Sequence, residues 1–261
     1  MAKPTGSEIM SNIQAEDSAV WDQASQRPNG LHLFESDLAA AITDAWSDVE
    51  DGLLIATVPV SGGSSAPGGP LAGGTATLAA GMLASNASFS AVASKFSSSF
   101  PDGATPELLA LVSAVAQGIG EKFPLWVAGY SATLIAVGGS AAWVPPAPPA
   151  NPSGAPGPWT GGSIQAFPIA GGSSTGDQGM TALSLEAAIG DAADPAKLKQ
   201  NENHTLQPAL SALVKAIAKG FETTWSQWKA KTRISAGSGS GTAVPPTGSI
   251  AVGAVTSPQI G

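Results

Sequence analysis

Apolar residues recur at steps of three and four positions in a long stretch near the C-terminal end of the chain. The members of this apolar series are Leu206, Leu210, Leu213, Val214, Ile217, Phe221, Trp225 and Trp228. Such steps put side chains on one face of an α-helix. The pattern predicts a helix with Pro208 in its first turn, with Lys229 and Lys231 near its C-terminal end, and with both tryptophans in the core.

Two earlier stretches show the same period. One predicts a helix that starts near Pro106 and ends near Lys122, because Pro124 lacks the N–H that would continue the hydrogen-bond ladder. The other predicts a helix over about residues 36–51, with Ser36 as its N-cap. All three helices are expected to serve packing rather than chemistry.

Each predicted helix is followed by an apolar run that is short, rich in β-branched or aromatic residues, and bounded by glycines. These runs are residues 53–60, 126–137 and 232–236, and they predict strands. Residues 141–158 contain seven prolines and predict an extended, polyproline-like arm that cannot pack on itself. The pattern as a whole predicts an α+β fold of long helices, short strands and Pro/Gly-rich arms.

The chain also resembles itself at a fixed offset. At 102 residues, eight of the thirteen residues from Pro106 to Gly118 are identical to their counterparts. At 73 residues, Leu38, Ile42 and Trp46 fall over apolar residues of the same stretch. We interpret the chain as three modules, the first of them degenerate. Their limits are 1–72, 73–170 (with the arm 141–158) and 171–261 (with a Gly/Pro-rich tail, 237–261).

Composition and charge narrow the classes of function. Only 11% of the residues are charged while 43% are hydrophobic, so the chain can bury a core. The net charge of −8 argues against a surface that neutralises phosphates, and we expect no nucleic-acid partner. We also expect no membrane span, because no apolar run approaches about 18 residues, and the N-terminus lacks the apolar segment of a secretory signal.

Catalytic and metal-binding groups are scarce. The chain has no cysteine, and its two histidines, His32 and His204, are each expected to be surface or cap residues. The Gly-rich segments 62–64 and 171–173 lack the lysine of a phosphate-binding loop and predict turns. We therefore expect no enzyme activity, no catalytic residue, no cofactor and no metal.

An acidic cluster lies in and after the first predicted helix. It could suggest a divalent-ion site, but the glycine and terminal glutamate of a Ca²⁺-binding loop are missing. We predict a solvated helix face instead. The cluster consists of Asp44, Asp48, Glu50 and Asp51.

The surroundings of the prolines predict an interface with neighbouring chains. Trp143 and Trp159 border an arm that has little core of its own, so both are expected to anchor in a neighbour. In a free monomer the arm and the Gly-Ser segment 237–241 should be mobile, and neighbouring subunits should order them. The predicted interface consists of Trp143, Pro145, Pro146, Trp159, Val244, Pro245 and Pro246.

One nine-residue sequence occurs twice, at 111–119 and 213–221, as Leu-Val-x-Ala-Ile/Val-Ala-x-Gly-Ile/Phe, and a tryptophan follows each time. The chain also has two Val-Pro-Pro elements, at 144–146 and 244–246, a low charge, no cysteine and an N-terminus without a signal. In these features it resembles structural proteins of tailed bacteriophages and of phage-derived contractile injection systems.

This resemblance implies a structural subunit that is ordered by assembly. Its partners would be copies of itself and other structural subunits, in a virion or extracellular particle that assembles in the bacterial cytoplasm. The alternative is a non-catalytic module that binds carbohydrate or protein through exposed tryptophans, with Trp143 and Trp159 as the first candidates.

Overall fold

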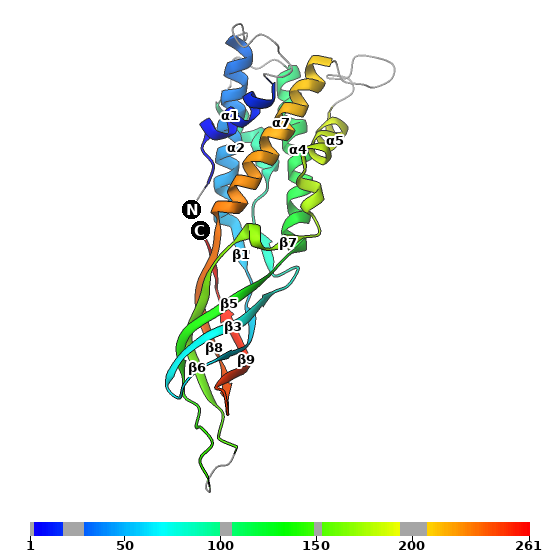
Figure 1. Cartoon of the computed structure of the whole chain (residues 1–261). Coiled ribbons are helices and arrows are strands. Elements are labelled where there is room, and N and C mark those ends of the chain that lie inside the picture. Colours follow the sequence, from blue (N-terminus) through cyan, green and yellow to red (C-terminus); the bar gives the residue numbers. More distant parts are fainter. Residues whose placement is uncertain (1–2, 18–28, 100–105, 149–152, 194–207) are drawn as a thin grey trace.

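A computed structural model of the chain describes residues 3–17, 29–99, 106–148, 153–193 and 208–261. Figure 1 shows an elongated molecule with helices at one end and strands at the other. The described residues between β5 (Tyr130–Ala141) and β6 (Gly157–Pro168) project beyond the other strands at the far end, and the first described residues and the C-terminus lie near the junction of the two halves. The predicted α+β class is confirmed.

Six α-helices lie in the described residues, and three of them are 24 residues long. The long helices run along the axis of the molecule, and the shorter ones pack against them (Figure 1). The short helices are α1 (Gly6–Asp17), α3 (Val92–Ser99) and α5 (Ala182–Ala192), and the long ones are α2 (Asn29–Gly52), α4 (Pro106–Gly129) and α7 (Pro208–Lys231). Three 3₁₀ turns accompany them: η1 (Phe89–Ala91), η2 (Ile169–Gly171) and η3 (Asp177–Met180).

Six antiparallel strands form a closed barrel. Their order around it is β8, β6, β5, β3, β2 and β9, and pairing of β9 with β8 closes the circle. The barrel strands are β2 (Val58–Ser64), β3 (Gly69–Leu78), β5 (Tyr130–Ala141), β6 (Gly157–Pro168), β8 (Arg233–Val244) and β9 (Ser249–Thr256). Short strands pair at its helical end: β1 (Leu53–Ile55) with β4 (Leu83–Ser85), β7 (Ser173–Ser174) with β5, and β10 (Gln259–Ile260) with β8.

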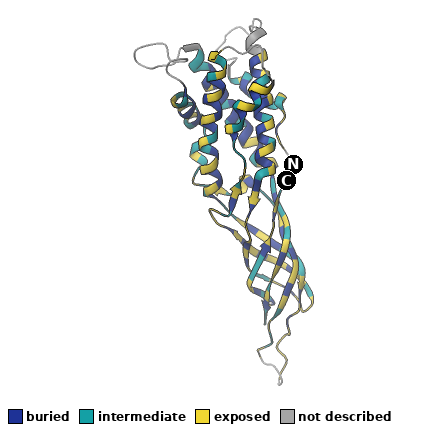
Figure 2. Cartoon of the chain, turned by 180° about the vertical axis from the view of Figure 1, so that it is seen from behind, coloured by how far each residue is buried: buried dark blue, intermediate teal, exposed yellow. Residues whose placement is uncertain are grey.

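The core of the helical half is a cluster of aromatic rings. The Trp225 ring centroid lies 4.7 Å from that of Trp126 and 4.8 Å from that of Trp228. Trp46 joins the cluster, with its centroid 5.2 Å from that of Phe221. Trp225 and Trp228 are both 1% exposed, so their predicted place in the core is confirmed. Figure 2 shows buried residues on the facing sides of the helices and exposed ones outside.

The barrel is narrow and is filled by a few large side chains among glycines. Trp159 is fully buried, and its Nε1 donates to the carbonyl of Gly138 at 2.9 Å. A Cβ added at Gly162 would lie 1.8 Å from Trp159 Cζ2, and one at Gly239 would lie 2.3 Å from Cη2. Glycine is therefore required beside the indole because any side chain would occupy its space.

Two predictions about helix ends are wrong. Ser36 is not an N-cap, since α2 already begins at Asn29. Pro124 does not end its helix, because α4 continues to Gly129. A proline at 124 leaves the carbonyl of Gly120 without its usual donor, and the hydroxyl of Ser88 donates to that carbonyl at 3.4 Å. The helix starts predicted at Pro106 and Pro208 are confirmed.

The predicted strands differ in length from the observed ones. Residues 126–129 are still helical, so the second strand begins at Tyr130. The third extends well past residue 236, since β8 runs to Val244 and includes the whole Gly-Ser segment 237–241. That segment pairs with β6 and with β9. The chain itself orders it, and no neighbour is needed.

The predicted polyproline arm is also different in the structure. Residue 141 ends β5, residue 157 begins β6, and between them Val144 and Ala155 pair as an isolated bridge. The bridge has two backbone hydrogen bonds of 2.9 Å. Residues 141–148 and 153–158 thus form the two arms of a β-hairpin that packs on itself. Pro145, Pro146, Pro148 and Pro156 lie outside β5 and β6, where no ladder N–H is required.

By length and composition alone, α4 could cross a membrane, which the sequence analysis does not expect. Nearly half of its most apolar stretch is buried against the other helices. A long apolar helix that is partly buried in this way is also typical of the core of a helical bundle.

Candidate functional site

The structure places both predicted tryptophan anchors inside the chain. Trp159 is buried in the barrel, and Trp143 is 6% exposed, with its Nε1 donating to the carbonyl of Ser65 at 3.2 Å. Neither indole therefore offers a surface to a neighbour, and their prediction as interface anchors is corrected. The sequence does not reveal the glycines that pack against them from distant strands.

The two Val-Pro-Pro elements lie together at the far end of the barrel. A Cβ at Gly154 would touch both the carbonyl of Val144 and the ring of Pro245, at 2.5 and 2.6 Å. Pro145, Pro146 and Pro246 are exposed, whereas Val244 and Pro245 are half-buried. Apart from Trp159, which is buried in the barrel, the predicted interface residues lie at this tip around the β5–β6 hairpin.

Tryptophan side chains give no ligand platform in the described part of the chain. Each of the six described tryptophans is buried: Trp46, Trp126, Trp143, Trp159, Trp225 and Trp228. A stacking site for sugars needs an exposed ring face. The carbohydrate-binding alternative therefore loses the residues on which it depended.

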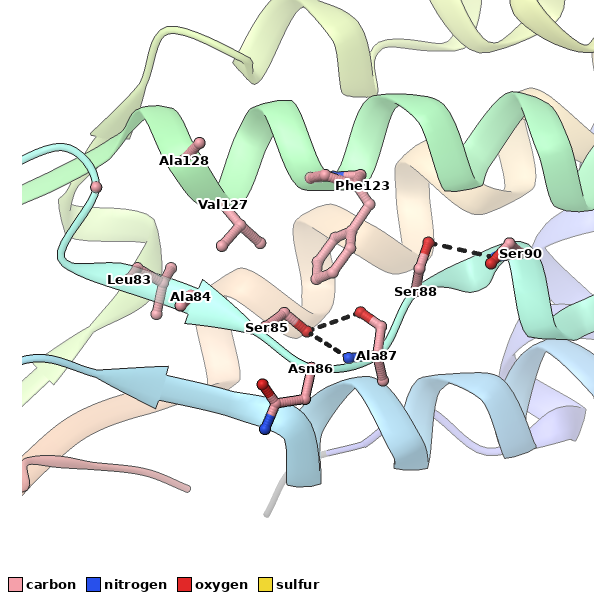
Figure 3. Close-up of a pocket in the computed structure, with 12 residues that line it drawn as sticks. Leu83, Ala84, Ser85, Asn86, Ala87, Ser88, Ser90, Phe123, Val127 and Ala128 are labelled. Carbon is pink, nitrogen blue, oxygen red and sulfur yellow. Dashed lines mark hydrogen bonds between the residues drawn. The ribbon is translucent and has the colours of Figure 1, made fainter.

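A groove of about 520 Å³ lies between the C-terminal half of α4 and the segment from Leu83 to Ser90. Figure 3 shows Phe123 and Val127 pointing from α4 toward this segment. No residue that lines the groove has a titratable side chain. The groove can hold an apolar group, but it has no acid or base for general acid–base chemistry.

The hydroxyls of the groove are used within the segment itself. Ser85 Oγ donates to the carbonyl of Ala87 at 2.8 Å and accepts from the amide of Ala87 at 3.2 Å, as Figure 3 shows. Ser88 Oγ accepts from the amide of Ser90 at 3.4 Å and donates to Gly120. These bonds fix the turn into η1, and none of the described residues that line the groove is a base that could make either hydroxyl a nucleophile.

The acidic cluster of α2 is split between surface and core. Asp44 and Asp51 are exposed, and Asp48 forms an ion pair with Lys95 at 2.6 Å. Glu50 is only 5% exposed, so its prediction as a solvated residue is wrong. Burial raises the pKa of Glu50, while a hydrogen bond from Trp228 Nε1 at 2.5 Å opposes that rise.

Asp177 joins the second and third long helices near the barrel. Trp126 Nε1 donates to its Oδ1 at 2.9 Å, and Lys229 Nζ lies 3.3 Å from the same oxygen. The amide of Ser174 donates to Oδ2 at 2.8 Å. Each oxygen of the carboxylate is thus occupied, which indicates a structural role.

Only one of the two histidines lies in the described part of the chain. His32 lies in the first turn of α2, and His204 lies outside the described residues. Over the described ranges, no group of three or more His, Asp or Glu side chains is close enough to hold a metal ion.

The outer wall of the barrel is the largest feature that sequence reasoning missed. Its exposed positions include Thr77, Gln165 and Thr256 on three different strands. The signal for it is present in the sequence: residues 53–94, 123–176 and 234–261 contain no Asp, Glu, Lys or Arg. These ranges include every residue of the barrel strands except Arg233.

A comparison of the chain with protein-family models, curated proteins and solved structures gives no match in any of the three. The class of the molecule therefore rests on its own architecture, which is a helical bundle joined end to end to a closed six-stranded antiparallel barrel.

Proposed function

We propose that the chain is a structural subunit of a large particle, such as a phage virion or a contractile injection system, and that three modules surround one axis within it. The common strand register of its three hairpins carries the threefold arrangement, and the resemblance of the sequence to structural proteins of tailed bacteriophages supports the particle. Its partners are other structural subunits of the particle, and the chain acts through the surfaces that it offers them.

The long helices support three modules. α4 and α7 begin at Pro106 and Pro208, an offset of 102 residues, and each has 24 residues. Gly118 and Gly220, at the same offset, make the same kind of contact. A Cβ at Gly118 would lie 2.8 Å from Ile189 of α5, and one at Gly220 would lie 2.7 Å from Ile13 of α1.

The barrel supports the same division. Leu71, Trp159 and Ile250 lie near the starts of β3, β6 and β9, and all three are buried. Each pairs across the module boundary with a glycine: Gly138, Gly241 and Gly62 in turn.

In each hairpin a second glycine lies three positions after the buried residue. Because this glycine has no side chain, it leaves room for the buried residue. The closest approach of an added Cβ to that residue is 2.8 Å at Gly74, 1.8 Å at Gly162 and 2.7 Å at Gly253. The three hairpins share one strand register and one packing of glycine against a large side chain. Copies of one unit arranged around an axis would share both features.

This division joins each hairpin to the long helix before it, so the first module ends with β3 at Leu78 rather than at residue 72. It also moves the alignment of that module by one helical turn. α2 and α4 have equal lengths and end at Gly52 and Gly129, so their offset is 77 residues rather than 73. Trp46 then corresponds to Phe123 and Trp225, and all three side chains lie in the aromatic cluster.

The proposal is tested on the purified chain and on its source. Size-exclusion chromatography with light scattering gives the mass of the isolated chain, and quantitative mass spectrometry of particles purified from the producing bacterium gives its copy number relative to known structural proteins. We expect a monomer in isolation and a fixed, sub-stoichiometric copy number in particles. Absence of the chain from every large particle in cells that produce it would refute the proposal.

A further inference from the structure

The three modules are alike on the barrel wall and unlike elsewhere on the surface. Resting on the proposed function, we infer that the barrel wall seats a threefold-symmetric protein ring, each subunit of which contacts one module through uncharged side chains. One chain would thus bind three identical partner chains, or a multiple of three.

The wall has equivalent exposed positions in all three modules. Thr77, Gln165 and Thr256 follow the buried residues Ala76, Ile164 and Val255 at the same place in each hairpin, and all three are exposed and uncharged. A second such set consists of Ala72, Thr160 and Ala251. Three identical subunits would therefore meet small, neutral surfaces of the same kind.

The helical half cannot offer three equal surfaces. α2 contains six acidic residues and neither Lys nor Arg, whereas α7 contains four lysines and one glutamate. The charge of α4 is intermediate, with two glutamates and one lysine. Identical subunits would find a negative helix, a nearly neutral helix and a positive helix, so they could not all bind well.

The far tip cannot offer three equal surfaces either. The turns that join the hairpin strands are residues 65–68, 142–156 and 245–248. One turn is therefore much longer than the other two, and it projects alone (Figure 1). Only the wall between the helices and the tip keeps the symmetry that a ring requires.

The near absence of charge on the wall favours a protein ring over other occupants. A nucleic acid or an anionic membrane would find one positive side chain there, Arg233, which is half-buried at the helical end of β8. Most exposed residues of the wall are threonine, serine, alanine, proline or glycine. Its exposed large apolar side chains, Ile135 and Val252, lie on β5 and β9, which are not neighbours in the barrel, so they form no continuous apolar band. A close-packed contact of neutral polar and small apolar side chains is left, and its strength should depend little on ionic strength.

The test is site-specific photo-crosslinking with p-benzoylphenylalanine in the full chain, produced in its native host. Single variants carry the crosslinker at Thr77, Gln165 or Thr256. Matched controls carry it at Asp44, Glu121 or Thr223, the corresponding positions of the three long helices. We expect each of the three barrel positions to link to the same peptide of the same partner, and the helix positions to give no common peptide.

Two further measurements sharpen this result. The crosslinked complex, isolated in 1 M NaCl, should contain three partner chains, or a multiple of three, per chain. Introducing Thr77→Glu, Gln165→Glu and Thr256→Glu together should reduce recovery of the partner at least tenfold, while near- and far-ultraviolet circular dichroism of the variant stays unchanged.

The outcomes separate this inference from the proposed function. Crosslinks from one barrel position only, to different proteins, or only from the helix positions would overturn the threefold ring while leaving the chain a particle subunit. A chain that gives no protein crosslink from any position and sediments as a monomer in lysate would overturn both.

Discussion

Only glycine fits at position 162, because the Trp159 indole packs against it. A Cβ at 162 would lie 1.8 Å from Trp159 Cζ2, so Gly162→Ala must displace the ring or the strand. We expect the free energy of unfolding to fall by about 1–3 kcal/mol, as is typical of overpacked cores. Urea denaturation followed by tryptophan fluorescence measures it.

The matched control for this substitution lies in α5. Gly190 has no heavy atom within 4 Å of an added Cβ and lies inside a helix. Gly190→Ala should therefore raise the free energy of unfolding by about 0.5–1 kcal/mol. Equal effects at the two glycines would contradict the packing of Trp159 described above.

Glu50 makes a pH-dependent contribution of defined sign. Burial raises the pKa of Glu50 in the folded state above its ordinary value in water, so the native chain binds a proton more readily than the unfolded chain. This contribution is largest below the unfolded pKa and is lost as the pH rises through the folded pKa. Glu50→Gln keeps an acceptor for Trp228 and removes the charge.

The variant should therefore be more stable than the wild type at pH 7, and the difference should shrink toward zero near pH 4. Chemical denaturation of both proteins across this pH range measures the difference, in which the titration of other groups cancels. An Asp44→Asn variant is the control, because Asp44 is exposed. A constant difference at every pH would show that Glu50 is ionised alike in the folded and unfolded chains.

At the scale of elements, α4 passes through Pro124 because another element supplies the missing donor. Ser88 Oγ reaches the carbonyl of Gly120, and it also accepts from the amide of Ser90. Ser88→Ala should cost about 1 kcal/mol. In a Pro124→Ala background residue 124 regains an N–H for Gly120, so the same substitution should cost about 0.5 kcal/mol less. A double-mutant cycle from urea denaturation measures this coupling, and strictly additive effects would exclude it.

The sequence predicts elements better than it predicts their partners. Helical periodicity locates α4 and α7 because residues that are close together in the sequence form the apolar face of a helix. Barrel closure depends on pairing between β2 and β9, which lie almost at opposite ends of the sequence, and no local pattern encodes it. For the same reason the sequence predicts Trp159 as an anchor in a neighbouring chain, since Gly239, which leaves room for its ring, is distant in sequence.

At the scale of the whole molecule, bundle and barrel are joined by continuous chain at three places. α2 ends at Gly52 where β1 begins at Leu53, α4 meets β5 at residue 130, and only Thr232 separates α7 from β8. Thr232 is itself buried, with its amide bonded to the carbonyl of Trp228. Strain or loss of order in the barrel should therefore reach the helices.

Truncation after Val244 tests this coupling, because it removes β9, which pairs with both β2 and β8. The open barrel leaves two strand edges unpaired, and we expect the helical signal at 222 nm to melt at least about 10 °C lower, since a few kcal/mol shift Tm by that amount in a chain of this size. Replacing residues 145–154 by a short turn is the control, because among the described contacts it disturbs only the Val144–Ala155 bridge and the packing of Gly154 against Pro245, and its Tm should stay within about 2 °C. A truncated chain whose helices melt at the wild-type temperature would mean that the bundle folds independently of the barrel.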